Sequence, residues 1–90
     1  MEASELRAAL VGLALEAGLE VRETRAAGGE APPESNVCRV HGAVWVVLSS
    51  ADPLEHQLEV LARALREHRG PWLERRYLPP ALRARLFDGV

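Results

Sequence analysis

The sequence of 90 residues has no lysine, no isoleucine and a single cysteine, and only 4% of its residues are aromatic. One cysteine cannot form a disulfide within the chain, which excludes a small secreted fold held together by disulfides. The longest strongly apolar run, 43–48, is far shorter than the roughly 20 residues that a helix needs to span a bilayer. The first residues are acidic where a signal peptide would be basic. We therefore expect a soluble cytoplasmic protein without membrane contact.

The missing lysine means that all eleven basic residues are arginine. A GC-rich genome favours the codons of arginine, alanine, glycine, proline and leucine, and such a bias needs no functional cause. Adaptation to high temperature also lowers the content of asparagine, glutamine, cysteine and methionine, but it usually enriches lysine together with glutamate. The composition therefore favours codon bias, with thermophily as a companion, and neither explanation identifies a function.

Charge is distributed unevenly along the chain. Residues 63–86 contain seven arginines and two glutamates, a balance of +5. Residues 1–62 contain four arginines, nine glutamates and one aspartate, a balance of −6. Such asymmetry indicates either a basic docking surface or a basic end that folds back onto the acidic part or pairs with it in a dimer.

A helix is predicted near the N-terminus, with Ser4 as its N-cap. Apolar side chains recur at helical spacing on one face, at Leu6, Leu10, Leu13 and Ala17. Gly18 is expected to end the helix in the left-handed conformation, with Leu19 packing back on the last turn. Gly12 lies inside the helix at a cost of about 1 kcal/mol relative to alanine, and we interpret it as a close approach between helix and sheet.

Three strands are expected next. Residues 19–25 alternate as in an edge strand with one wet face, and 26–36 are predicted to form a mobile surface loop. Residues 37–40 and 43–48 flank His41-Gly42, which predicts a hairpin with a type I′ turn, because both positions accept positive φ. The second strand of this hairpin has no polar face, so we expect it to be central and covered on both sides.

A second helix is predicted after Asp52, which would cap it, with Pro53 in the first turn and Glu55 in a capping box. Its apolar stripe consists of Leu54, Leu58, Leu61 and Leu65. Pairs at i,i+4 are expected on its solvated side, namely Glu59–Arg63 and Arg63–Glu67. Gly70-Pro71 is expected to stop this helix.

The chain is predicted to end in a short helix that opens at Pro79-Pro80 and carries Leu82 and Leu86. The order is thus helix, strand, hairpin, helix, short helix, in a single domain over residues 1–90 with one core. We expect an α+β fold, a two-layer domain with helices packed on a three-stranded, mostly antiparallel sheet.

The possible soft metal ligands lack the clustered spacing of a zinc site. Cys38 is interpreted as a small buried hydrophobe, His41 as a turn residue, and His56 and His68 as surface residues. Ser49-Ser50 lie near an aspartate but lack the Gly-x-Ser-x-Gly elbow of a nucleophile, and we interpret them as local caps. No phosphate-binding glycine loop is present in the sequence. We therefore expect no metal, no cofactor and no catalytic residue.

The segment from Val37 to His68 resembles the hairpin and helix of the ImmA/IrrE-type minimal metallopeptidases. These carry a Leu-Ala-His-Glu-x-x-His helix after a hairpin. When Leu61-Ala62 is aligned with the Leu-Ala of that motif, the two histidine positions hold Arg63 and Glu67. The position of the catalytic glutamate holds Ala64. The resemblance therefore implies the scaffold without the peptidase, and the layout also resembles small bacterial proteins that have no assigned activity.

The C-terminal arginines raise the hypothesis of nucleic-acid binding. Tyr77 and Trp72 would stack on bases, and four arginines would contact phosphates: Arg75, Arg76, Arg83 and Arg85. The pI of about 5.9, the few aromatic residues and the lack of a known nucleic-acid-binding motif argue against it. The competing interpretation is that Trp72, Leu73 and Leu78 pack on the sheet, while the arginines face solvent or pair with glutamates.

The leading hypothesis is a non-catalytic module that associates with itself, as a homodimer, or with a protein partner. The contact surface would be an edge strand or the interface formed by Trp72, Tyr77 and Leu78. Nucleic-acid binding by the C-terminal arginines is the alternative.

Overall fold

The computed structural model describes residues 1–25 and 35–88, so most of the predicted loop, 26–36, lies outside the described residues. The order of elements along the chain confirms the predicted α+β class. The elements are α1 (Ala3–Glu16), β1 (Glu20–Thr24), β2 (Asn36–Val40), β3 (Ala43–Ser49), α2 (Leu54–Glu74), α3 (Pro80–Arg83) and the π-helical turn η1 (Ala84–Asp88).

The three strands form one sheet in the order β1-β3-β2, so β3 is central as predicted. His41 and Gly42 have φ of 49° and 83°, which confirms the tight hairpin between β2 and β3. β1 runs parallel to β3, with Val21 opposite Val46, and the sheet is therefore mixed rather than mostly antiparallel. The reason is topological: β2 lies between β1 and β3 along the chain, so no tight turn joins β1 to β3 and sets its direction.

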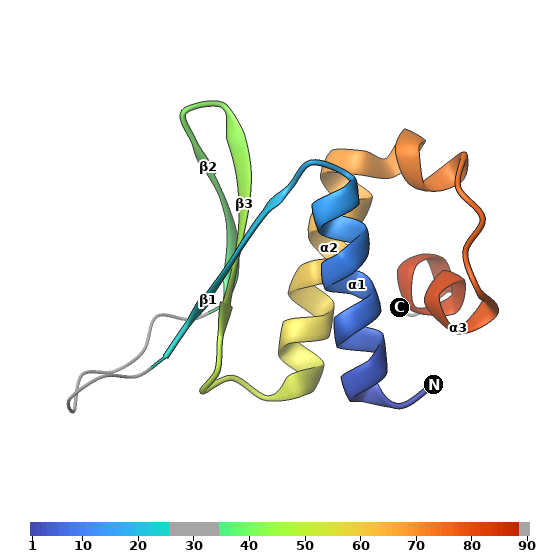
Figure 1. Ribbon diagram of the computed structural model, residues 1–90, viewed down its shortest axis with the longest axis horizontal. Coiled ribbons are helices and arrows are strands. Elements are labelled where there is room, and N and C mark those ends of the chain that lie inside the picture. Colours follow the sequence, from blue (N-terminus) through green and yellow to red (C-terminus); the bar gives the residue numbers. More distant parts are fainter. Residues whose placement is uncertain (26–34, 89–90) are drawn as a thin grey trace.

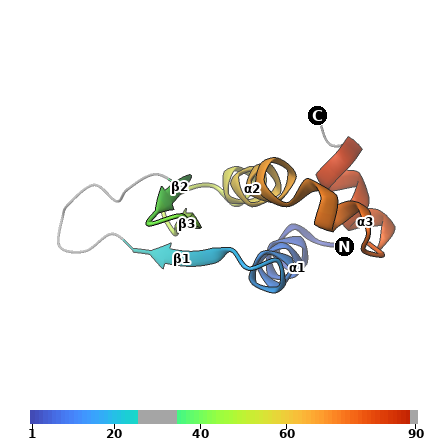
Figure 2. The ribbon, with the colours of Figure 1, turned by 90° about the horizontal axis from the view of Figure 1, so that it is seen from above.

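Helices α1 and α2 lie side by side on one face of the sheet, and α3 and η1 lie on the far side of this helix pair (Figures 1 and 2). The side chains of β3 that face the helices are buried, namely Val44, Val46 and Leu48. Trp45 and Val47 alternate with them and are only partly covered. The prediction that β3 is covered on both sides is therefore wrong, because the C-terminal helices pack on the helices and not on the second face.

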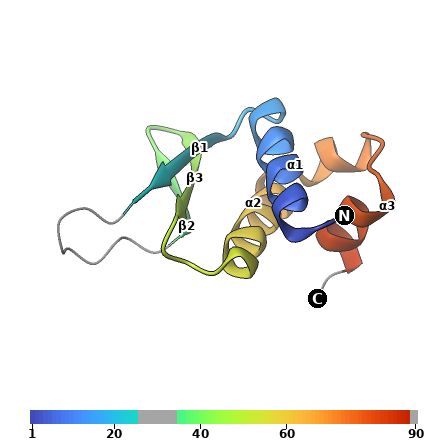
Figure 3. The same ribbon diagram turned by 60° about the horizontal axis from the view of Figure 1, so that its bottom comes forward.

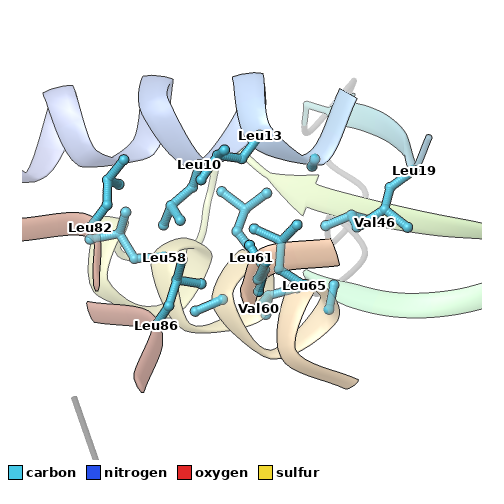
Figure 4. Packing of buried hydrophobic residues seen from close by; sticks show 14 of the residues in the cluster. Leu10, Leu13, Leu19, Val46, Leu58, Val60, Leu61, Leu65, Leu82 and Leu86 are labelled. Atoms are coloured by element: carbon cyan, nitrogen blue, oxygen red, sulfur yellow. The ribbon is translucent and has the colours of Figure 1, made fainter. Parts of the chain in front are cut away.

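Leucines from several elements form the core between these layers (Figure 4). Leu10 of α1, Leu61 of α2 and Leu86 of η1 are essentially inaccessible to solvent, as is Val46 of the sheet. Each such leucine contributes about 1.5–3 kcal/mol relative to an exposed position. Both sides of the α1–α2 pair are therefore apolar, and Leu73 near the end of α2 is also fully buried.

The ends of α1 follow the prediction only at the C-terminus. Gly18 adopts φ of 85°, and the Leu19 N–H donates a 2.9 Å hydrogen bond to the Ala14 carbonyl, which is the expected glycine cap. At the N-terminus the prediction of Ser4 as N-cap is wrong. The helix starts earlier, and Glu2 and Glu5 form the capping box.

Gly12 does not mark a close approach to the sheet, contrary to the prediction. A Cβ added at this position would meet nothing within 4 Å. Gly12 instead lines a shallow cavity of about 250 Å³ between α1 and residues 76–82. The glycine thus leaves open space on the outer side of the helix.

Helix α2 begins after Pro53 and has no side-chain cap, so the prediction of Asp52 as a cap is wrong. The first, long helix of α2 does end at Gly70-Pro71 as predicted, because two helices meet there across a kink. The backbone leaves helical geometry at Arg69, with φ of −138° and ψ of 28°, and a further helical turn follows through Glu74. Pro71 is tolerated because it lies in the first turn after the kink, and the N–H groups of a first helical turn have no intrahelical partners.

The surface ion pair of α2 also differs from the prediction. Glu59 pairs with Arg66, at 3.2 Å, and not with Arg63. Arg66 also donates a 3.2 Å hydrogen bond to the Leu86 carbonyl. The Arg66 guanidinium therefore connects η1 to α2. Because it is held in this position, Arg66 rather than Arg63 pairs with Glu59.

Candidate functional site

The C-terminal arginines do not form one surface. Arg76 contacts Glu16 of α1 at 2.6 Å, with its guanidinium 5.2 Å from the centre of the Trp72 ring. Arg85 contacts Glu55 in the first turn of α2 at 2.8 Å. The last turn of α1 and the first turn of α2 lie at opposite ends of the helix layer (Figure 1). The basic end of the chain therefore folds back onto its acidic part at these two contacts, one of the alternatives that the charge distribution left open.

The other two arginines of the predicted phosphate-binding set are separately placed. Arg83 lies over Phe87, with its guanidinium carbon 5.4 Å from the ring centre. Arg75 is exposed at the end of α2. Arg75 and Arg76 are thus adjacent at the end of α2. Arg83 and Arg85 lie elsewhere and contact Phe87 and Glu55, respectively.

The predicted interface of Trp72, Tyr77 and Leu78 is only partly on the surface. Leu78 is 5% exposed and belongs to the core, so its assignment to an interface is wrong. It is buried because the chain turns back at Pro79 to pack α3 against α1. Tyr77 is 83% exposed, and Trp72 is partly covered beneath Arg76. Of these three residues, only Tyr77 is fully available to a partner, and it lies at the rim of the cavity that Gly12 also lines.

The potential metal ligands are dispersed. Within residues 1–25 and 35–88, no three His, Cys, Asp or Glu side chains gather in a way that would hold a metal ion. His41 lies at the hairpin turn, as predicted. Cys38 is exposed, so the prediction of a buried cysteine is wrong. The register explains its exposure, because Cys38 lies opposite Trp45 on the face that no described helix covers.

A polar junction that the sequence did not indicate joins the start of β2 to the loop before α2. The Asp52 carboxylate accepts a 2.7 Å hydrogen bond from the Ser35 N–H, and Ser35 Oγ accepts one of 2.8 Å from the Ser49 N–H. Hydrogen bonds from the Ser35 side chain and backbone lower the pKa of Asp52, and His56 adds a smaller effect. The serine hydroxyl thus interacts with a carboxylate rather than an imidazole, which is not the arrangement that activates a nucleophile.

The buried amide of Gln57 connects this junction to α1. Its Oε1 accepts a 2.8 Å hydrogen bond from Arg7 Nε, and its Nε2 donates one of 3.0 Å to the Asp52 carbonyl. Arg7 also pairs with Glu23 of β1. Both ends of the amide are satisfied, so Gln57 holds helix, strand and loop together. The only sequence signal was a polar residue beside the apolar stripe of α2.

One side of the sheet is covered by no described helix, and Figures 2 and 3 show helices on the other side only. We call it the open face. Trp45 and Val47 of β3 form its centre, and the pairing register adds Cys38 and Val40 from β2. Arg22 of β1 covers part of the indole, with its guanidinium carbon 4.7 Å from the ring centre. The open face is thus apolar along β3 and β2 and charged along β1.

No protein-family model matches this chain, and comparison with curated proteins and with solved structures gives no significant match. No helix in residues 1–25 and 35–88 has the length and apolar character needed to cross a membrane.

The positions aligned with the zinc-peptidase motif are all on the long straight part of α2. Ala64 is fully buried in the core, Arg63 is partly covered, and Glu67 is exposed. The side chain at the position of the catalytic glutamate therefore lies among leucines and has no polar group.

Proposed function

We propose that this chain is a non-catalytic association module that forms a homodimer through the β2 side of its sheet. The observation that carries the proposal is the open face. Trp45 and Val47 lie on the central strand and are partly exposed, with Arg22 of β1 over part of the Trp45 indole. Exposed apolar surface on a sheet favours association, since burying it removes apolar area from water.

The charge of the open face supports a second copy as the partner. A two-fold interface brings the same patch of both copies together, so a net charge on that patch would repel. The charged side chains on this face are Glu20 and Arg22, one of each sign, and they lie 3.8 Å apart. The face is therefore electrically neutral as well as partly apolar, and it can meet its own copy without unpaired charge.

The placement of the reactive side chains supports a non-catalytic role. Ser35 and Asp52 are engaged in joining β2 to the loop before α2, and His56 is exposed. The motif positions Arg63, Ala64 and Glu67 carry no zinc ligand pair, in line with a scaffold that lacks peptidase activity. The single cysteine supports a cytoplasmic location.

Analytical ultracentrifugation tests the proposal. A contact along one strand of five residues buries less than the roughly 1,200 Å² at the low end of standard interfaces, so we expect a dimer that dissociates between about 1 μM and about 1 mM protein. Trp45→Ala should weaken the dimer, whereas Trp72→Ala should not, because Trp72 belongs to α2, beneath Arg76, and is not part of the sheet. A chain that stays monomeric at the highest concentration would overturn the proposal.

A second candidate, nucleic-acid binding, is favoured by one observation. Tyr77 is exposed next to Arg75 and Arg76 and could stack on a base beside two cations. The contact between Arg76 and Glu16 weakens this candidate, because it neutralises one of the two charges.

A further inference from the structure

The two edges of the sheet differ in how well they are protected against pairing. β1 carries Glu20, Arg22 and Glu23 within five residues, and charged residues on an edge strand discourage a second strand from adding to it. β2 reads Asn-Val-Cys-Arg-Val and has one charge, at Arg39. The edge at β2 is therefore the less protected of the two.

The register defines which backbone groups of β2 face outward. Val40 and Ala43 flank a two-residue turn and form a hydrogen-bonded pair, and such pairs alternate along an antiparallel ladder. The N–H and C=O groups of Cys38 therefore face β3, while those of Val37 and Arg39 face outward. In the monomer, the outward Val37 N–H donates a 2.8 Å hydrogen bond to the Asn36 side chain.

We infer that two copies pair β2 with β2 in antiparallel orientation about a two-fold axis at Cys38. Val37 of each copy then lies opposite Arg39 of the other, and the four outward N–H groups meet four carbonyls. The result is one six-stranded sheet in which the open faces of the two copies join edge to edge, with each Trp45 one strand from the axis because it lies opposite Cys38. This inference rests on the proposed function and specifies its interface.

Other symmetric registers are less favourable. An axis at Arg39 places the two Arg39 side chains directly opposite each other, and like charges in that position are destabilising. An axis at Val37 pairs Arg39 with Ser35, whose N–H already donates to Asp52. Only an axis at Cys38 lets the outward N–H and C=O groups of both Val37 and Arg39 pair with those of the other copy.

Disulfide formation between the two Cys38 residues would test this register directly. At the axis, the Cys38 residues of the two copies form a non-hydrogen-bonded pair with Cα atoms about 4.5 Å apart. That separation lies within the roughly 4.4–6.8 Å that a disulfide spans. The thiol is exposed, and it is the only one in the chain.

Oxidation with diamide is the first test. The two thiols lose two protons and two electrons, which reduce the azo bond of diamide to a hydrazine, and a disulfide-linked dimer forms. The matched control is Val40→Cys in the Cys38→Ser background, because the two positions 40 would lie roughly 14 Å apart in this register. We expect the native cysteine to cross-link at least about tenfold faster than the cysteine introduced at position 40.

Proline at the edge is the second test. Arg39→Pro removes an outward N–H and leaves the ladder to β3 intact, so the chain should fold but the dimer dissociation constant should rise about tenfold or more. Arg39→Ala keeps the N–H and should not weaken the dimer. Asn36→Ala frees the Val37 N–H and should strengthen it.

The outcomes separate this inference from the proposed function. A chain that is monomeric in the ultracentrifuge overturns both. A dimer that survives Arg39→Pro and cross-links no faster at Cys38 than at position 40 overturns the register and leaves self-association standing. If Arg39→Pro lowers the melting temperature so far that the chain unfolds, the comparison of the two cysteine positions decides the register by itself.

Discussion

Arg69 Nε donates a 2.7 Å hydrogen bond to the Ala17 carbonyl at the end of α1, although the two residues are far apart in the sequence. The same guanidinium donates from Nη1 to the His68 carbonyl, also at 2.7 Å, beside the kink of α2. Carbonyls at helix ends lack intrahelical partners, and here one partly buried side chain satisfies two of them. The kink and the end of α1 are thereby held together.

Replacing this arginine should destabilise the fold. We expect Arg69→Ala to lower the free energy of unfolding by about 1.5–3 kcal/mol, the range for hydrogen bonds to charged groups. Arg75→Ala, at an exposed neighbouring position, should change it by less than about 0.5 kcal/mol. Urea denaturation followed by circular dichroism measures both, and equal effects would show that the contacts of Arg69 are not stabilising.

Gly12 inside α1 and Gly18 just after it should respond in opposite directions to alanine. Gly12 is helical and a Cβ there meets nothing, so Gly12→Ala should stabilise the chain by about 0.5–1 kcal/mol. Gly18 has positive φ, so Gly18→Ala should destabilise it by about 1–2 kcal/mol. Thermal melts of the two variants check this pair, and a destabilising Gly12→Ala would imply that the cavity needs its open space.

Asp52 should make stability depend on acid pH. Hydrogen bonds from Ser35 lower the pKa of Asp52 below its ordinary 3.8 in the folded state. Its contribution is therefore fully present above the unfolded pKa and is lost as pH falls through the folded pKa. We expect the gap in unfolding free energy between the wild type and Asp52→Asn to be constant near neutral pH and to shrink below pH 3.8.

Urea titrations at a series of pH values measure that gap. Ser35→Ala provides the control, because it removes the hydroxyl that contributes most to the lowered pKa of Asp52. The variant should show a weaker dependence on acid pH than the wild type. A gap of the same size at neutral and acid pH would contradict the assignment.

Nucleic-acid binding should be absent or feeble. Arg76 and Arg85 each contact a glutamate, so few free cations remain to displace counterions from phosphates. We expect no shifted band with single-stranded DNA at about 50 mM salt, where a phosphate-driven complex is strong. A shift that fades with added salt and is lost in Arg75→Ala would instead favour the second candidate function.

The features that the sequence predicted correctly depend on neighbouring residues. The turn at His41-Gly42 and the helix end at Gly18 need positive φ, a requirement that one or two residues express by themselves. The apolar spacing of α2 likewise reports its buried stripe. These signals are local, and they were sufficient to predict the hairpin, the central strand and the two long helices.

The features that the sequence could not predict depend on distant residues. Nothing near β1 indicates that it runs parallel to β3, and nothing near Asp52 indicates that its partner is Ser35 rather than the helix that follows it. The open face was missed for the same reason. The apolar run of β3 suggests two covered faces, and only the position of the C-terminal helices shows that no described helix covers the second one.

The parallel pairing of β1 with β3 has a consequence for the order of folding. Glu20 lies opposite Trp45, a separation of 25 residues, whereas Val40 and Ala43 meet across a two-residue turn. Loop closure costs more entropy for the longer separation, so the hairpin should form early and β1 should dock late. Amide hydrogen exchange should therefore be slower in β3 than in β1. The strand that completes the sheet is then the first to leave it, and brief opening at β1 would widen the apolar surface around Trp45.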